Sequence, residues 1–277
     1  MIDSGLGGLT IVGALARLLP DEKIIYFADT ARVPYGPRTP EAVIGFARQI
    51  VRFLADEQPK HFVLACNTLT ALALPALRAA WGDLSFSGVI EPTARAAVEA
   101  AGAKPHPLFA VLATEATIRS RAYERALARR RNRAMVLLRP APLLVPIVEE
   151  GRDAADPLVR LALRQYLHPL LARKVDVVIL GCTHFNALCS GVQQVVGPGV
   201  VVVDASQRCA DDVVRRLGSA GKLKQGGVGG IRGFVTDDPT RFRQLAARLV
   251  GLTLDEPRLV RVDSLPSDRP ALVRAAG

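Results

Sequence analysis

The sequence predicts an α/β fold of two pseudo-symmetric lobes, each a mostly parallel sheet flanked by helices, with a ligand site between them. The first observation is that apolar stretches of strand length alternate with amphipathic stretches of helical length along most of the chain. Such helices are the crossovers that parallel strands need. The second is that two apolar stretches, residues 61–65 and 175–180, lead into a cysteine followed by small polar residues. Ligands bind outside the carboxyl ends of strands in open α/β sheets, so two such units could face one ligand from opposite sides.

The chain begins with a glycine-rich loop. Residues 5–8 (GLGG) precede apolar residues with helical spacing at 9–19. A glycine loop that opens a helix usually follows a strand, and there is almost no room for one before Asp3. We therefore expect the first strand to be absent, or the start of the chain to be assigned late. The loop lacks the spacing of the dinucleotide and phosphate-binding motifs.

The following elements continue the alternation. Residues 23–28 are predicted to be a strand and 29–36 a structured loop. Thr39 is a good N-cap for a helix with proline in its first position. The rest of this half consists of the thiol-ended strand at 61–65, a helix at 69–80, a short strand at 88–91 and a helix at 93–101.

The second half repeats this pattern. Glycine-rich residues 226–233 are predicted to be a loop, and a short apolar segment ends at residues 149–151. We assign residues 1–93 and 205–255 to a first, discontinuous lobe, 94–204 to a second lobe, and 256–277 to a loosely ordered tail. The strands are expected at 108–113, 134–139, 175–180, 200–203 and 233–236, and the main helices at 117–130, 153–172, 209–218 and 239–250.

The composition limits the class of protein. The chain has 277 residues, of which 49% are hydrophobic, so a large core is available. No run reaches the roughly 18 apolar residues of a membrane helix, and no secretory leader opens the chain, so we expect a cytoplasmic protein without membrane contact. Its 4 cysteines fit reduced thiols there, and none has CxxC or zinc spacing.

The charge balance is basic. Lys and Arg outnumber Asp and Glu by 36 to 26, which gives a formal net charge of +10. The densest run, residues 119–139, includes three consecutive arginines at 129–131. No nucleic-acid-binding signature accompanies them, so we interpret the run as a solvated helix and turn, and a nucleic-acid partner is not expected.

The two thiols suggest proton-transfer chemistry. The reactive form of cysteine is the thiolate, which is favoured near a helix N-terminus. Asn67, Thr68 and Thr183 place hydrogen-bond donors beside the thiols, and His184 could exchange a proton with Cys182. One thiolate could remove a proton from one face of a carbon while the opposite thiol protonates the other face.

Other interpretations of these residues stay open. A cysteine after an apolar strand is most often a small buried hydrophobe, and the pair could instead be a disulfide switch, which needs Cα atoms within about 7 Å. Cys189 and Cys209 lie on helical stretches without polar flanks and are expected in the core.

Several motifs together resemble the glutamate racemases of the aspartate/glutamate racemase superfamily. Each motif is modest alone, but their number and order are specific, and the resemblance covers about residues 1–250. It is carried by residues 3–10 (DSGLGGLT), 26–30 (YFADT), 33–36 (VPYG), 65–68 (ACNT) and 181–184 (GCTH).

The resemblance implies a racemase that uses neither pyridoxal phosphate nor a metal and that supplies D-glutamate for peptidoglycan. It implies that Cys66 deprotonates D-glutamate with the support of Asp3, and that Cys182 deprotonates L-glutamate with the support of His184. It also implies that the substrate is bound by Ser4, Pro34, Tyr35, Gly36, Asn67, Thr68, Thr114, Thr117 and Thr183.

Further acidic residues follow from the same resemblance. Asp29 and Glu149 are similar to acidic site residues of the family, and the sequence does not decide whether Glu149 or Glu150 points inward. Dimers are common in the family, so a homodimer is a further expectation. The chain departs from the family pattern at Phe185-Asn186, where Tyr-Pro is usual.

Two alternative functions remain. One is a racemase or isomerase of another small acid such as aspartate, which a substrate panel would separate. The other is a non-catalytic regulator that binds a partner, because some members of the family are similar to gyrase-binding regulators. Full activity after loss of either thiol would favour such an indirect role.

Overall fold

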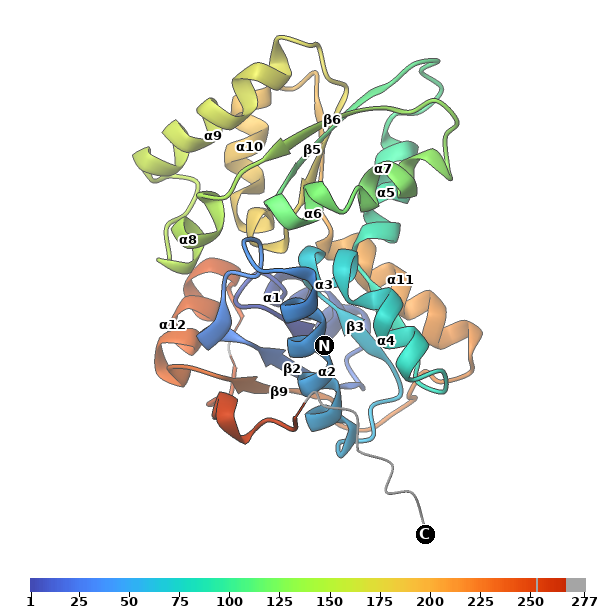
Figure 1. The fold of residues 1–277 in the computed structure, drawn as a ribbon, viewed down its shortest axis with the longest axis vertical. Coiled ribbons are helices and arrows are strands. Elements are labelled where there is room, and N and C mark those ends of the chain that lie inside the picture. The colour runs from blue at the N-terminus through green and yellow to red at the C-terminus, as the bar shows by residue number, and fades with distance from the viewer. Residues whose placement is uncertain (253, 268–277) are drawn as a thin grey trace.

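The computed structural model describes residues 1–252 and 254–267. It contains two separate sheets in two lobes, which lie one above the other in Figure 1. Every strand pairing in both sheets is parallel. Helices pack on the sheets, as parallel strands require, so the predicted α/β class is confirmed.

The first sheet has the strand order β10-β9-β2-β1-β3-β4. Its strands come from the two ends of the chain, and together they form the lower lobe in Figure 1. The strands are β1 (Ile2–Asp3), β2 (Lys23–Ala28), β3 (Phe62–Leu64), β4 (Phe86–Gly88), β9 (Gly230–Val235) and β10 (Arg258–Leu259).

The second sheet has the order β6-β5-β7-β8. Numbered by appearance within each lobe, both sheets contain strands in the order 2-1-3-4, and a cysteine follows the third strand of each. The two lobes are thus built on one plan. The strands of the second sheet are β5 (Leu108–Ala113), β6 (Met135–Pro140), β7 (Val177–Gly181) and β8 (Val201–Val203).

The helices connect these strands. Thr39 caps α2 as predicted, because its hydroxyl accepts a hydrogen bond from the Ala42 amide at 3.3 Å. No helix in the described part of the chain has the length and apolar character to cross a membrane. The helices are α1 (Leu9–Leu18), α2 (Pro40–Ala55), α3 (Asn67–Leu72), α4 (Leu74–Ala80), α5 (Ile90–Ala100), α6 (Glu115–Arg119), α7 (Ala122–Ala128), α8 (Leu144–Glu149), α9 (Pro157–Leu171), α10 (Cys189–Val196), α11 (Ser206–Ser219) and α12 (Pro239–Val250), with 3₁₀ turns η1 (Thr30–Arg32), η2 (Thr183–Leu188) and η3 (Val262–Ser264).

The expectation that the first strand is absent is wrong. Ile2 and Asp3 form a two-residue strand between β2 and β3, with Ile2 opposite both Phe27 and Leu64. The backbone amides of Phe27 and Ala65 donate to the carbonyls of Met1 and Ile2 at 3.0 and 2.8 Å. This short central strand is what brings Asp3 to the carboxyl edge of the sheet.

Three other segments differ from expectation. The strand predicted at 88–91 lies earlier, at Phe86–Gly88, and α5 begins at Ile90. The predicted loop at 226–233 enters β9 at Gly230. Of the expected tail, residues 256–267 are described: β10 pairs with β9, and Val260 and Leu265 are buried. Residues 268–277 lie outside the described part.

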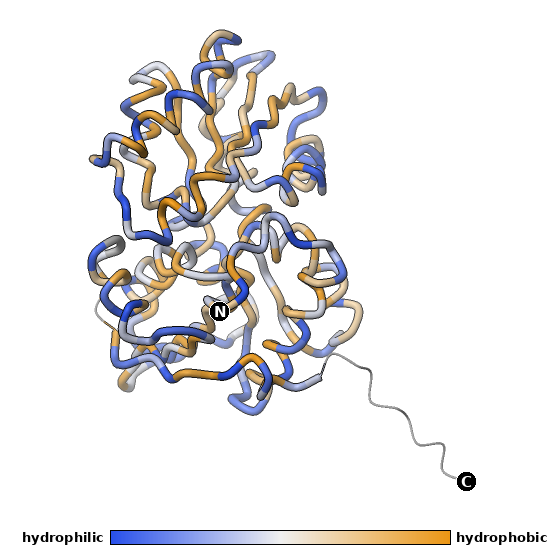
Figure 2. The backbone as a smooth tube through the Cα atoms, turned by 60° about the vertical axis from the view of Figure 1, so that its left-hand side comes forward, coloured by the Kyte–Doolittle hydropathy of each residue, from blue (hydrophilic) through white to orange (hydrophobic). Residues whose placement is uncertain are grey.

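The core runs through both lobes. Residues alternate across the first sheet, so Tyr26 and Ala28 of β2 belong to one buried cluster and Phe27 to another. The cluster that contains Tyr26 also includes Phe109 of β5 and Val213 of α11, and therefore continues from one lobe into the other. Figure 2 shows hydrophobic stretches inside both lobes and hydrophilic ones at outer turns.

Candidate active site

Both candidate catalytic thiols lie at the carboxyl edge of their sheets. Cys66 follows β3 and precedes α3, and Cys182 follows β7 and precedes η2. Both are buried, with exposed fractions of 6% and 5%. Both are free thiols. The glycine loop of the first lobe connects their surroundings, because the Ser4 hydroxyl donates to Cys66 Sγ and a Cβ on Gly7 would meet Thr183, the residue after Cys182. The two predicted thiols therefore flank the same loop.

The groups that act on Cys66 include a neutral hydroxyl and a carboxylate. Its Sγ is 3.8 Å from the hydroxyl of Ser4, which donates to it. Burial and the nearby Asp3 carboxylate raise the pKa of the Cys66 thiol to about 12, against the opposing effect of the Leu69 amide. This raised pKa favours the protonated thiol, which has a proton to donate.

Asp3 is held rigidly behind Cys66. Its Oδ2 accepts from the amides of Gly5 and Gly8 at 3.2 and 3.0 Å and from the Tyr26 hydroxyl at 3.0 Å. Burial raises the pKa of Asp3 above its usual range, and the charge of His184 partly offsets this effect. Within the described residues, Asp3 Oδ1 is buried without a hydrogen-bond partner, which leaves an acceptor for a ligand.

Cys182 has a different partner. Nδ1 of His184 lies 3.8 Å from its Sγ, and Nε2 of His184 lies 2.5 Å from Oε1 of Glu149. Burial alone lowers the pKa of His184, but its hydrogen bonds to Cys182 and Glu149 together raise it well above its usual value. The imidazole lies between the thiol and the carboxylate, and both partners favour its protonated form.

The structure decides between the two neighbouring glutamates. Glu149 Oε1 accepts from His184 and from the Leu6 amide at 3.0 Å, which joins the second lobe to the glycine loop of the first. Burial raises the pKa of Glu149, yet its hydrogen bond to His184 and the charge of His184 outweigh this and lower it. Glu150 instead pairs with Arg152 at the surface.

Three threonine hydroxyls bridge the lobes. Thr68 Oγ1, at the start of α3, lies 3.0 Å from Thr114 Oγ1 and 3.5 Å from Thr117 Oγ1 of the second lobe. Thr114 and Thr117 are 3.0 Å apart. Hydroxyls both donate and accept, so this cluster can re-form its hydrogen bonds around a carboxylate.

Asn67 adds a donor to the same region. Its Oδ1 accepts a hydrogen bond of 2.8 Å from the Tyr123 hydroxyl, which fixes the orientation of the amide. Its Nδ2 is buried and has no partner among the described residues. A buried, unsatisfied amide is costly, so this group is available for a ligand oxygen.

Two glycines let the first lobe approach the second. A Cβ on Gly5 would lie 2.2 Å from Oε1 of Glu149, and one on Gly7 would lie 2.5 Å from the backbone nitrogen of His184 and 2.7 Å from Thr183 Oγ1. Only glycine fits at these positions. Thr183 is thereby placed against the glycine loop of the first lobe.

The loop from Asp29 to Gly36 contributes differently from expectation. The Asp29 carboxylate is occupied by other residues: it accepts from Arg32 Nε at 2.6 Å, from Thr236 Oγ1 at 3.0 Å and from the Tyr35 hydroxyl. The Tyr35 hydroxyl thus donates its hydrogen bond to Asp29 inside the first lobe. Gly36 lies against Thr114, since a Cβ there would be 2.9 Å from its Cβ.

A small pocket lies beside Glu149 and the turn that contains Pro34. It is lined by Pro34 together with Val33, Glu149 and Arg241, among others. Arg241 of α12 donates to the carbonyl oxygen of Glu149 at 3.3 Å and helps to lower the Glu149 pKa. Among the described residues, no group of His, Cys, Asp and Glu side chains could hold a metal ion.

Three supporting residues were missed from the sequence. Tyr26 and Tyr123 orient Asp3 and Asn67, and Arg241 connects α12 to Glu149. Tyr26 stands in the motif at residues 26–30, but nothing in that motif shows that its hydroxyl donates to Asp3. Cys209 is buried as expected, and Cys189 is half-buried at the start of α10.

Comparison with known proteins finds similar chains of nearly the same length. The glutamate racemase of Neisseria meningitidis is 39% identical over 261 residues, which covers 94% of this chain and 95% of that protein. The structure of glutamate racemase from Bacillus anthracis superposes with a TM-score of 0.88 at 34% identity and covers 94% of this chain and 96% of that one. The Francisella tularensis enzyme, solved in complex with D-glutamate, gives a TM-score of 0.86 at 30% identity, covering 95% and 97%.

The match to a family model covers most of the chain. Residues 10–211 match the model described as Asp/Glu/Hydantoin racemase, and this range contains both thiols, His184 and Glu149. The resemblance found in the sequence motifs is confirmed. The chain belongs to the Asp/Glu/hydantoin racemase family.

Proposed function

We propose that this protein is a glutamate racemase that interconverts L- and D-glutamate by proton transfer between two thiols, without an added cofactor. The observation that carries the proposal is the pair Cys66 and Cys182, each at the end of the third strand of its lobe and each with its own proton partner. Glutamate is favoured over aspartate because the similar proteins and structures named above are glutamate racemases.

The unsatisfied groups of the site complement an amino acid. Asp3 Oδ1 is a free acceptor that suits the substrate ammonium, and Asn67 Nδ2 is a free donor that suits a carboxylate oxygen. The hydroxyls of Thr68, Thr114 and Thr117 offer further donors. Ser4 and Thr183, and the turn that contains Pro34 and Gly36, complete the proposed binding surface.

In the L-to-D direction, the Cys182 thiolate removes the α-proton, so the Cα–H bond breaks and an S–H bond forms. The protonated His184 stabilises that thiolate by charge before the transfer, and Glu149 holds the imidazole. Cys66 then gives its thiol proton to the opposite face of the carbon and becomes a thiolate. After the product leaves, Cys66 regains a proton from solvent and Cys182 releases the proton it took to solvent, so no net proton is consumed. Asp3, whose pKa is raised by burial, is the proposed carrier of the proton to Cys66.

Positioning must supply most of the rate. Each general acid or base typically contributes about 10²–10⁴-fold, and the α-proton of an amino acid is only weakly acidic. The rest of the rate enhancement comes from binding the substrate in the reactive orientation and from hydrogen bonds to the negative charge that develops in the transition state. The rigid hydrogen bonding of Asp3 and Asn67 fits this requirement.

The experiment is Cα-proton exchange of each glutamate enantiomer in deuterated water, without added cofactor. The wild type should incorporate deuterium with inversion. Cys66→Ser and Cys182→Ser should each lose racemisation, whereas Cys189→Ser, a half-buried thiol outside the site, should retain it. Folded wild-type protein that exchanges no proton would refute the glutamate assignment, and a panel including aspartate would then identify another acid or a non-catalytic role.

We further propose that the product serves peptidoglycan synthesis, that residues 94–204 form the second lobe, and that the protein is a homodimer. The lobe boundary is supported by the strands, since all four strands of the second sheet fall within that range. The dimer is an expectation from the family, which sedimentation of the purified protein would test.

A further inference from the structure

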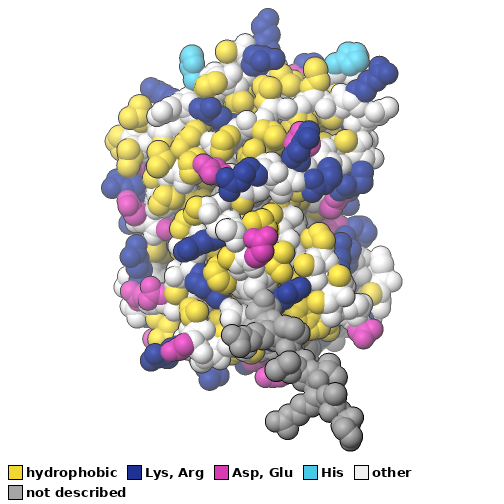
Figure 3. Space-filling model, in the orientation of Figure 1, with side chains coloured by type: hydrophobic (Ala, Val, Ile, Leu, Met, Phe, Trp, Pro, Cys, Tyr) yellow, Lys and Arg dark blue, Asp and Glu magenta, His cyan; other side chains and the backbone are white. Residues whose placement is uncertain are grey.

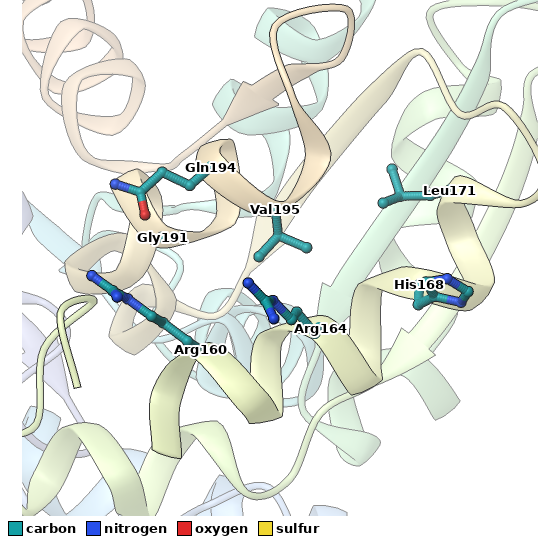
Figure 4. Close-up of a pocket in the computed structure, with 7 residues that line it drawn as sticks. All are labelled: Arg160, Arg164, His168, Leu171, Gly191, Gln194 and Val195. Atoms are coloured by element: carbon teal, nitrogen blue, oxygen red, sulfur yellow. The ribbon is translucent and has the colours of Figure 1, made fainter. Parts of the chain in front are cut away.

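A groove on the second lobe lies outside the candidate active site. It runs between α9 and α10 and has a volume of about 460 Å³, within the range of small-molecule pockets. Figure 4 shows the side chains of Arg160 and Arg164 extending from α9 toward α10. The groove is lined by Arg160, Arg164, His168 and Leu171 of α9 and by Gly191, Gln194 and Val195 of α10.

The groove has an uncompensated row of basic side chains. Arg160, Arg164 and His168 are spaced four residues apart and so share one face of α9. All three are exposed, and none forms an ion pair within the described residues. Asp156, one turn before Arg160, is already paired with Arg152 at 2.8 Å. Like charges at this spacing oppose each other, which an anionic ligand would relieve.

The remaining lining is uncharged. Gly191 brings α10 close to α9, because a Cβ there would lie 3.0 Å from Ala154 Cβ and from Leu163 Cδ1. Leu171 and Val195 add apolar surface, and Gln194 contributes an amide at the rim. Apolar surface beside a cationic row suits a ligand with an anionic end and an uncharged end.

Arginine favours a particular anion. Each guanidinium presents a planar fork of donors that binds phosphate oxygens in pairs. Arg160 makes only one contact that occupies this fork, a 3.4 Å hydrogen bond from Nε to the Ala154 carbonyl, and Arg164 makes none in the described part of the chain. Two neighbouring forks match two neighbouring phosphate groups.

We propose that this groove binds a small molecule carrying a diphosphate, such as a nucleoside diphosphate, with its phosphates on Arg160 and Arg164 and its uncharged part over Leu171 and Val195. A small molecule is favoured over a nucleic acid because the row occupies one face of one helix. On the face drawn in Figure 3, other basic side chains are interspersed with acidic ones and form no continuous stripe.

Calorimetric titration of the full-length protein with inorganic pyrophosphate, inorganic phosphate and ADP at fixed ionic strength tests this. Pyrophosphate and ADP should bind at one site, and phosphate should bind more weakly. ADP tighter than pyrophosphate would identify a nucleotide as the source of the phosphates, whereas equal affinities would identify free diphosphate. Arg160→Gln/Arg164→Gln should weaken binding by at least about tenfold, and Arg160→Lys/Arg164→Lys by less.

Arg243→Gln is the matched control, because Arg243 is an exposed arginine of α12 that does not line this groove. It should leave both affinities unchanged. Circular dichroism and retained racemase activity would show that the variants are folded. The proposal is overturned if the wild type binds neither pyrophosphate nor ADP, if the double glutamine variant binds them as well as the wild type, or if a single-stranded oligonucleotide binds this surface in preference to ADP.

Discussion

Nε2 of His184 lies 2.5 Å from Oε1 of Glu149, and the other ring nitrogen of His184 lies 3.8 Å from the sulfur of Cys182. The carboxylate, imidazole and thiol thus form a continuous chain through the second lobe. The Leu6 amide of the first lobe also donates to the same oxygen of Glu149. The pairing of His184 with Glu149 inside the second lobe is therefore coupled to the contact that the Leu6 amide makes between the lobes.

Glu149→Gln should lower kcat/KM for glutamate by roughly 10- to 100-fold, a part of the 10²–10⁴ expected from one acid–base group. Glutamine keeps the shape but removes the charge that holds His184 protonated. The alkaline limb of the pH profile should consequently move to lower pH. Stopped assays of both enantiomers over a pH series would measure this.

Glu150→Gln is its control, because Glu150 is the adjacent residue and lines the same small pocket, yet it pairs with Arg152 and makes no hydrogen bond to His184 within the described residues. Its kinetics should match those of the wild type. Equal losses in both variants would contradict the assignment of Glu149 as the inward-facing residue.

The same pair predicts how stability depends on pH. The pKa of His184 is raised in the folded protein, so its contribution is complete below the usual value of 6.5 and is lost as pH rises through the folded value. The pKa of Glu149 is lowered, so its contribution is present above the usual 4.5 and is lost as pH falls through the folded value. The destabilisation by Glu149→Gln should therefore be largest between about pH 4.5 and 6.5.

Chemical denaturation of the wild type and Glu149→Gln at several pH values would measure this difference. Breaking a buried pair costs roughly 3–5 kcal/mol when a charge is left alone, and we expect less here because glutamine still accepts a hydrogen bond. A difference that grows steadily toward alkaline pH would contradict the proposed charge state.

Gly7→Ala should impair activity by at least about 10²-fold, because its Cβ would meet backbone atoms of the second lobe at 2.5 and 2.7 Å. Backbone cannot move aside as a flexible side chain can, so the lobes must separate. Activity and thermal unfolding of the purified variant would be measured together.

Gly13→Ala provides the comparison within the same region. Gly13 lies inside α1, and its Cβ would meet nothing closer than Arg17 Nη1 at 3.8 Å. Alanine in a helix is more favourable than glycine by about 0.5–1 kcal/mol, so this variant should be active and slightly more stable. Equal activities of the two variants would mean that the glycine loop tolerates lobe separation.

Asp29→Asn should destabilise the protein by roughly 3–5 kcal/mol, while changing kcat/KM by less than about tenfold at temperatures where it stays folded. The reason is that the Asp29 carboxylate is already occupied by hydrogen bonds from Arg32, Tyr35 and Thr236. Asp3→Asn should do the reverse and mainly affect turnover. An inactive Asp29→Asn variant of normal stability would restore its expected role as a site residue.

The sequence predicted those elements whose signal is local. β2 and β5 have the predicted bounds, because each is an apolar run that ends at a polar residue. The strand predicted at 88–91 was misplaced, since Val89 and Ile90 favour strands locally but start a helix that accepts Pro92 in its first turn. Residues 230–232 fall in the glycine-rich stretch 226–233, yet they pair with Lys23, Ile24 and Ile25 of β2.

The same distinction between local signals and contacts made by the fold applies to the candidate active site. The thiols and His184 stand in short motifs and could be found by position alone. The roles of Tyr26, Tyr123 and Arg241 depend on contacts between residues 21 to 92 positions apart, which only the fold brings together. Asp29 also stands in a motif, but the motif does not show which way its carboxylate points.

The two sheets share one strand order, but the thiols at their ends have unlike partners, a carboxylate for Cys66 and an imidazole for Cys182. The enantiomers of glutamate have the same free energy in water, so the ratio of kcat/KM for the forward and reverse reactions is fixed at unity by thermodynamics. The asymmetry can thus change how tightly each enantiomer is held and how fast its complex reacts, but only in compensating amounts. Any substitution on one side of the site must slow both directions equally at low substrate concentration.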